Sequence, residues 1–94
     1  MADGEGYRGV NKKELINYAR ELLDLTNTTY LVSNYGNEIE FASRTILNTE
    51  VKLYPTTGTF INNNRTFKSA RPYDEHEIKA QIKYCIKYHI NEKI

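Results

Sequence analysis

The sequence contains little cysteine, tryptophan or proline: Cys85 is the only cysteine, tryptophan is absent, and there are two prolines in 94 residues. A single cysteine cannot form an intramolecular disulfide, which excludes the stapled scaffolds of small secreted proteins. It also excludes zinc fingers and ribbons held by several thiolates. The chain lacks an apolar run of about 18 residues, so we expect no membrane-spanning helix and no membrane partner. These absences favour an ordinary globular domain.

The first residues lack the marks of a targeting segment. Met1–Tyr7 has neither the charged nor the apolar region of a signal peptide. Ala2 stands where N-myristoylation requires glycine. We therefore expect a cytoplasmic location. Three glycines and scattered charges predict that residues 1–10 form a flexible tail before a single domain at residues 11–94.

The charge is nearly balanced, with 13 Lys+Arg against 12 Asp+Glu and a net charge of +1. This excludes a strongly basic nucleic-acid tail and an acidic mimic of DNA as descriptions of the whole chain. The balance conceals a division. Residues 1–50 carry five basic and eight acidic side chains, a net charge of −3, whereas residues 51–94 carry eight basic and four acidic ones, a net charge of +4. No acidic residue occurs in segment 51–73.

Two segments have the apolar period of an amphipathic helix. Residues 12–25 follow Asn11, a residue type that caps helix N-termini, and their apolar side chains recur on one face. Residues 75–91 follow Asp74, another capping residue, and present a stripe of isoleucines. We expect helices over both ranges.

Short runs of β-branched and aromatic residues predict a small, mostly antiparallel sheet. Thr28–Ser33 reads as one strand. Residues 50–68 alternate in polarity and are interrupted by turn residues at Pro55–Gly58 and Asn62–Asn64, which predicts a β-meander.

Residues 37–47 fit two patterns. Ile39 and Phe41 alternate with glutamates, as in a strand, but the apolar positions of this segment also form a helical stripe. We favour a short helix at 37–47. The expected fold class is therefore α+β, with the meander 50–68 packed by helices 12–25 and 75–91.

No arrangement of residues favours catalysis, a metal or a cofactor. The phosphate-loop, dinucleotide-binding and Gly-x-Ser-x-Gly patterns are all absent. Residues 74–77 are acidic or histidine, but consecutive helical residues point in different directions. Cys85 and His89 are one helical turn apart, yet both fall in the apolar stripe, where a cysteine behaves as a small hydrophobe. We expect a protein that is not an enzyme and that needs no cofactor.

Basic and aromatic side chains interleave in segment 51–73. Tyrosine and arginine are enriched at protein interface hot spots, and cations beside rings also bind single-stranded nucleic acid. A secondary basic row on the last helix consists of Lys79, Lys83 and Lys87, and it either extends a phosphate track or is a solvated edge. The candidate partner-binding residues are Tyr54, Arg65, Phe67, Lys68, Arg71 and Tyr73.

Residues 51–61 read Val-Lys-Leu-Tyr-Pro-Thr-Thr-Gly-Thr-Phe-Ile. This stretch resembles the Tyr-Pro-Thr-Thr-Gly hairpin of short proteins encoded by bacteriophages and prophages, in which a helix near the C-terminus also follows. Leu53 stands where those proteins often have an aromatic residue. The resemblance carries over no functional residue. It implies a provenance, and small viral accessory proteins often bind a host protein, for example a defence or nucleic-acid-processing enzyme.

The leading hypothesis is a small non-enzymatic binding protein, a phage or mobile-element accessory factor that binds and modulates a host protein. The expected contact surface is the exposed face of the 51–73 meander. One alternative is a nucleic-acid-binding module that uses the same residues. Another is a self-associating structural subunit that buries the sheet edge or the Tyr84/Tyr88 edge of the last helix.

Overall fold

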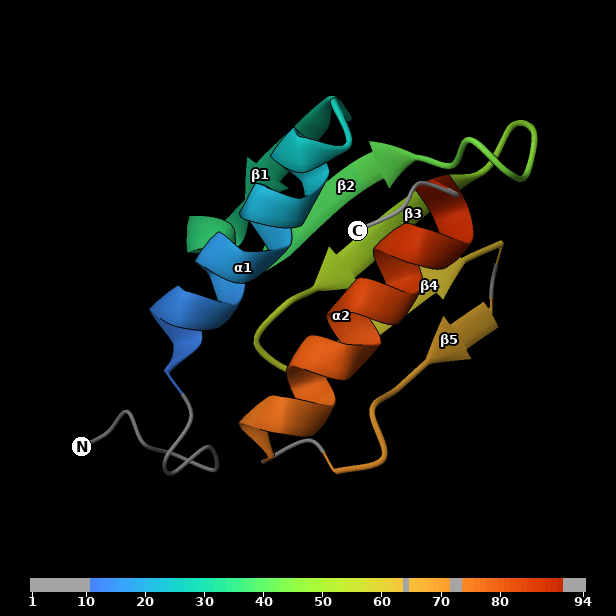
Figure 1. Cartoon of the computed structure of the whole chain (residues 1–94). Helices are drawn as coiled ribbons and strands as arrows, with labels where there is room; N and C mark the ends of the chain where they lie inside the picture. The colour runs from blue at the N-terminus through green and yellow to red at the C-terminus, as the bar shows by residue number, and fades with distance from the viewer. Residues whose placement is uncertain (1–10, 64, 72–73, 91–94) are drawn as a thin grey trace.

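The computed structural model of the chain describes residues 11–63, 65–71 and 74–90. Two helices lie side by side over one face of an antiparallel sheet (Figure 1). The helices are α1 (Lys12–Leu25) and α2 (Glu75–Ile90). The sheet has five strands in the order β1-β2-β3-β4-β5, namely β1 (Tyr30–Ser33), β2 (Glu38–Ala42), β3 (Glu50–Tyr54), β4 (Thr59–Asn62) and β5 (Arg65–Phe67). This confirms the α+β fold and the meander. The predicted tail at residues 1–10 lies outside the described residues.

Both helices begin at the capping residues that the sequence indicates. The side chain of Asn11 accepts a hydrogen bond from the backbone N–H of Glu14 at 3.0 Å. The side chain of Asp74 accepts one from the backbone N–H of His76 at 2.9 Å. The predicted helix 12–25 is confirmed, and α2 matches its prediction up to Ile90, the last described residue. No helix in the described ranges is long and apolar enough to cross a membrane.

The short helix expected at 37–47 is a wrong prediction, because residues 38–42 form the strand β2. β2 pairs with β1 on one side and with β3 on the other. In the strand, Ile39 and Phe41 both face the helices and are buried. A helix would have left Phe41 off the apolar face. Cross-strand pairing, which is not local in sequence, decides between the two patterns.

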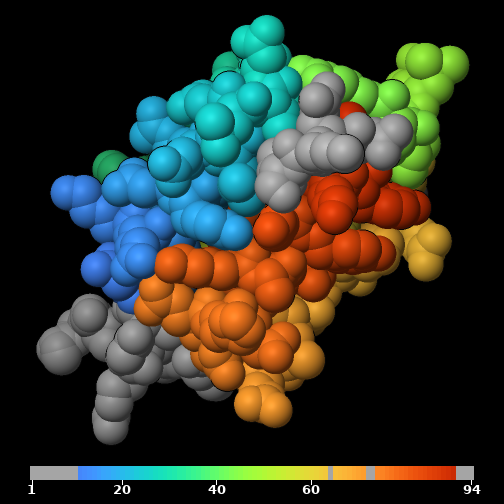
Figure 2. All heavy atoms as spheres, viewed as in Figure 1, coloured from blue at the N-terminus to red at the C-terminus, as the bar shows by residue number. Residues whose placement is uncertain are grey.

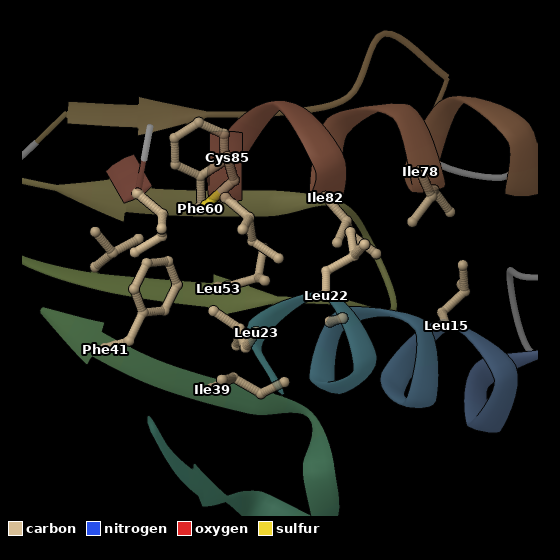
Figure 3. Close-up of a cluster of buried hydrophobic side chains, with 14 residues drawn as sticks. Leu15, Leu22, Leu23, Ile39, Phe41, Leu53, Phe60, Ile78, Ile82 and Cys85 are labelled. Atoms are coloured by element: carbon tan, nitrogen blue, oxygen red, sulfur yellow. The ribbon is translucent and has the colours of Figure 1, made fainter. Parts of the chain in front are cut away.

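The core lies between the sheet and the two helices (Figure 3). Figure 3 shows the sheet side chains Leu53 and Phe60 reaching toward Ile82 and Cys85 of α2. Both layers therefore contribute to one hydrophobic cluster, and its members are Leu15, Ala19, Leu22, Leu23, Ile39, Phe41, Val51, Leu53, Phe60, Ile78, Ile82, Cys85, Ile86 and Ile90.

The turn between β3 and β4 contains the Pro-Thr-Thr-Gly sequence and packs against α2. Gly58 has φ +75°, and its N–H donates to the carbonyl oxygen of Tyr54 at 2.9 Å. A Cβ at this position would lie 3.3 Å from the backbone Cα of Ile78 and 3.3 Å from the Cβ of Ser69. The hairpin thus needs glycine both for its left-handed backbone and for its approach to the helix.

We expect Gly58→Ala to lower the free energy of unfolding by about 1–3 kcal/mol, because alanine disfavours positive φ and its methyl group crowds α2. Urea denaturation measures the change. Thr66→Ala, at an exposed position of β5, is the control and should change the stability by less than about 0.5 kcal/mol. A Gly58→Ala protein as stable as the control would contradict this packing.

Candidate interaction surface

The structure describes five of the six predicted partner-binding residues and places them on different surfaces. Tyr54 alternates with the buried Leu53, so it faces away from the helices, on the open side of the sheet. Lys68 is exposed directly after β5. Arg71 precedes α2 and forms a 3.7 Å ion pair with Asp74. Tyr73 lies outside the described residues.

Among the five of these residues that the structure describes, Arg65 and Phe67 are in contact with each other. Both belong to β5 and share the face of the sheet that carries the helices, since Phe67 pairs with the buried Phe60. The two phenyl rings stack with centroids 4.6 Å apart. The guanidinium of Arg65 lies 5.4 Å from the centre of the Phe67 ring, which is a cation–π arrangement.

Two tyrosines of α2 continue this row of rings. The ring of Tyr84 lies 6.0 Å from that of Phe60, and it stacks on Tyr88 at 5.8 Å with an angle of 29° between the planes. Tyr84 is 48% exposed and Tyr88 is 44% exposed. The sequence singles out these tyrosines as an edge for self-association. It does not connect them with Arg65 and Phe67, because the connection passes through Phe60 and depends on how α2 crosses the sheet.

The predicted basic row on α2 divides into two parts. Lys83 and Lys87 are exposed, and Lys87 lies one helical turn from both Lys83 and Tyr84. Lys79 instead lies 2.9 Å from a carboxylate oxygen of Glu14 in α1. The hydrogen bond and attraction from Glu14 raise the pKa of the Lys79 ammonium, so this lysine ties α2 to α1.

We call the surface formed by Arg65, Phe67, Lys83, Tyr84, Lys87 and Tyr88 the basic–aromatic strip. Its tyrosines lie on the side of α2 that meets β4, and Lys83 and Lys87 lie on the exposed side of α2, with Lys83 one helical turn from Lys79. Figure 2 shows α2 in the middle of this side of the molecule, with α1 on one side and the strands β4 and β5 on the other. No acidic residue occurs in the described residues 51–71, and none occurs in α2 after Glu77. The strip therefore presents cations and rings without a neutralising carboxylate from its own elements.

A polar depression of about 510 Å³ lies elsewhere, beside the first half of α1. Its lining includes Asn11, Asn17 and the paired Glu14 and Lys79. It contains no residue of the basic–aromatic strip.

A buried histidine joins α2 to two other parts of the fold. The side-chain N–H of Asn62 donates to Nε2 of His89 at 2.7 Å, so Nδ1 carries the proton and donates to Oγ of Ser43 at 2.9 Å. The ring is fully buried, and burial lowers its pKa. The row Ser43–His89–Asn62 has the composition of a catalytic triad, but its imidazole is enclosed, and Nδ1 donates to the hydroxyl rather than accepting its proton.

Cys85 is enclosed in the same core. Burial raises the pKa of its thiol, which keeps the sulfur protonated and unreactive. His89 lies one helical turn away, but both of its ring nitrogens already have partners. Within the described residues, no group of three or more histidine, cysteine or acidic side chains is placed to hold a metal ion.

The β2–β3 loop closes over the C-termini of both helices. The backbone N–H groups of Arg44 and Thr45 both donate to the carbonyl oxygen of His89, at 2.7 Å and 3.1 Å. The Arg44 guanidinium donates to the carbonyl oxygens of Thr26 and Asn27, at 3.0 Å and 2.9 Å, just beyond the end of α1. This loop satisfies backbone carbonyls that a helix end leaves without partners.

Because the pKa of His89 is lowered on folding, we expect the stability of the fold to depend on pH. The pKa of this histidine is lowered in the folded chain and lies near 6.5 when unfolded. Its contribution to stability is therefore complete above about pH 6.5 and is lost as the pH falls toward the folded-state value, by about 1.4 kcal/mol for each unit of lowering. We expect His89→Gln to flatten this part of the stability–pH curve, measured by urea denaturation at several pH values. His76→Gln, at an exposed position, should leave the slope unchanged. Equal slopes in the wild type and His89→Gln would contradict the account.

No protein-family model matches the chain, and comparison with curated proteins and with solved structures finds no match. The geometry of the strip is therefore the basis for the functional argument.

Proposed function

We propose that this protein is a small non-enzymatic binding protein that uses the basic–aromatic strip to bind an acidic surface of a partner protein. The observation that supports this proposal most directly is the row of cations and half-exposed tyrosines along α2 and β5, in which no acidic residue occurs. Tyrosine and arginine offer large contact area and hydrogen bonds at small entropic cost, as at interface hot spots. With the phage-like hairpin, this chemistry supports an accessory factor that modulates a host protein in the host cytoplasm.

The arrangement of the rings favours a protein partner over a nucleic acid. Stacking of bases requires open ring faces. Phe67 lies against Phe60 on one face and has Arg65 over its ring, while Tyr84 and Tyr88 are stacked on each other. Ring edges and tyrosine hydroxyls are left for contact, and these suit side chains and backbone carbonyls. The three cations of the strip also form a modest electrostatic footprint for phosphate binding.

The same strip supports nucleic-acid binding as the second candidate function. Lys83 and Lys87 are spaced one helical turn apart and could each meet a phosphate. The two candidates differ in their response to nuclease and to nucleic-acid probes, so one experiment addresses both.

Affinity capture from the host with the folded chain as bait tests the proposal. We expect the bait to capture one host protein in stoichiometric amount, and we expect nuclease treatment to leave this capture unchanged. The double variant Lys83→Glu and Lys87→Glu should no longer capture this protein, whereas Lys13→Glu should still capture it. Lys13 is an exposed lysine of α1 and provides a charge reversal away from the strip. Capture that is equal for the double variant and the control would overturn the proposal. Salt-sensitive binding of single-stranded probes by the same variants, with no protein partner, would replace it by the second candidate.

A further inference from the structure

The edge strand β1 is apolar and carries no charge or proline that would protect a sheet edge. In the described chain β1 pairs with β2 alone, so its other side is open. Its sequence Tyr-Leu-Val-Ser has no charge and no proline, and proteins commonly place lysine, proline or a bulge on a free edge to prevent pairing. The opposite edge strand, β5, is three residues long, contains Arg65 and is followed by Lys68. One edge of the sheet is blocked by charge and the other is not.

Exposed apolar side chains gather around this open edge. Leu31 is 70% exposed, and Val32 is half-exposed on the other face of the same strand. Tyr35, in the turn that follows, is 99% exposed, and Leu25 at the end of α1 is also exposed. Two of the seven large hydrophobic side chains that are exposed in the described chain thus belong to this four-residue strand, and a third, Tyr35, lies in the turn that follows it. Such a concentration is typical of an interface.

The charge pattern favours a second copy of the same chain over a charged partner. Residues 25–37 contain no Asp, Glu, Lys or Arg. In a two-fold interface the same patch of both copies faces itself, so charges of one sign within the patch would face like charges of the copy. The nearest charges on the helix side compensate each other, because the Tyr30 hydroxyl donates to Asp24 at 3.1 Å and accepts from Arg20 at 3.5 Å. An antiparallel strand can pair with itself across a two-fold axis without repulsion.

We propose that β1 pairs antiparallel with β1 of a second copy, joining the two sheets into one continuous sheet. The pairing satisfies the free N–H and C=O groups of the edge and buries Leu31 and Val32. Because β1 and β5 are opposite edges of each sheet, the basic–aromatic strips lie at the two outer ends of the dimer and stay accessible. The inference is independent of the proposed function.

Light scattering on the purified full chain over a wide concentration range tests the pairing. We expect a mass that rises to twice that of the chain and then stays constant. Leu31→Lys should raise the dimer dissociation constant by at least about tenfold, because it removes the apolar contacts of Leu31 and brings two lysines close together in the joined sheet. Leu47→Lys is the matched control, since Leu47 is 87% exposed in the β2–β3 loop, and it should leave the dimer intact.

Each other outcome contradicts the proposal. A mass equal to that of one chain at every concentration would show that β1 does not pair with β1 of a second copy. A dimer that Leu31→Lys does not weaken uses another surface. Masses that keep growing beyond two copies indicate pairing of β1 with β5 of the next copy. Amide hydrogen exchange provides a second readout, in which the N–H groups of β1 gain protection as the concentration rises and Leu31→Lys removes this gain.

Discussion

Replacing His89 with alanine is expected to lower the free energy of unfolding by about 4 kcal/mol. The substitution empties a fully buried position that contacts the rings of Phe41, Phe60 and Tyr88. A cavity of this kind costs about 2–5 kcal/mol. It also leaves the buried side chain of Asn62 without its acceptor, which adds about 1–3 kcal/mol before the surroundings relax.

Urea denaturation at neutral pH measures this loss, and two variants separate its parts. His76→Ala, at an exposed position of the same helix, should change the stability by less than about 1 kcal/mol. His89→Gln keeps a polar side chain that can reach Asn62, so it should retain part of the stability. A loss below about 1 kcal/mol for His89→Ala would show that the ring does not join α2 to β4 as described.

The second large effect is expected in binding. Reversing the charge of both Lys83 and Lys87 should lower the affinity for the captured protein partner by about 100-fold, or roughly 2.7 kcal/mol of binding free energy. Each reversal replaces an attraction to the acidic partner surface with a repulsion, and close charge pairs at interfaces contribute about 1.5 kcal/mol or more. Both side chains are exposed in α2, so the fold should be unaffected. Titration calorimetry measures the affinity.

Lys13→Glu makes the same kind of charge change on α1 and should alter the affinity by less than about threefold, because only long-range screened attraction is affected. Higher salt should reduce the difference between the wild type and the double variant. An affinity that falls by about tenfold in Lys13→Glu, which reverses one charge instead of two, would indicate attraction by the net charge of the chain and not by the strip.

The helices were predictable because their signals are local. Asn11 and Asp74 mark the helix starts, and the apolar period within each segment indicates which face is buried. The meander was equally predictable from the sequence, since Pro55 and Gly58 mark a turn between alternating segments. In each case the deciding interactions lie within a few residues along the chain.

Segment 37–47 and the strip depend on contacts between distant residues. Ile39 fits a helix or a strand until pairing with Leu53 fixes the choice. The link from Phe67 to Tyr84 passes through Phe60 and exists only once α2 lies across β4. Likewise, nothing in the sequence around Arg44 indicates that its guanidinium lies at the end of α1.

The location of binding is tested most directly by amide hydrogen exchange of the chain with and without its captured partner. We predict that protection increases in β5 and in the second half of α2, the elements that carry the basic–aromatic strip, while α1 exchanges as before. Protection confined to the open face of the sheet, around Tyr54, or to α1 would contradict the account.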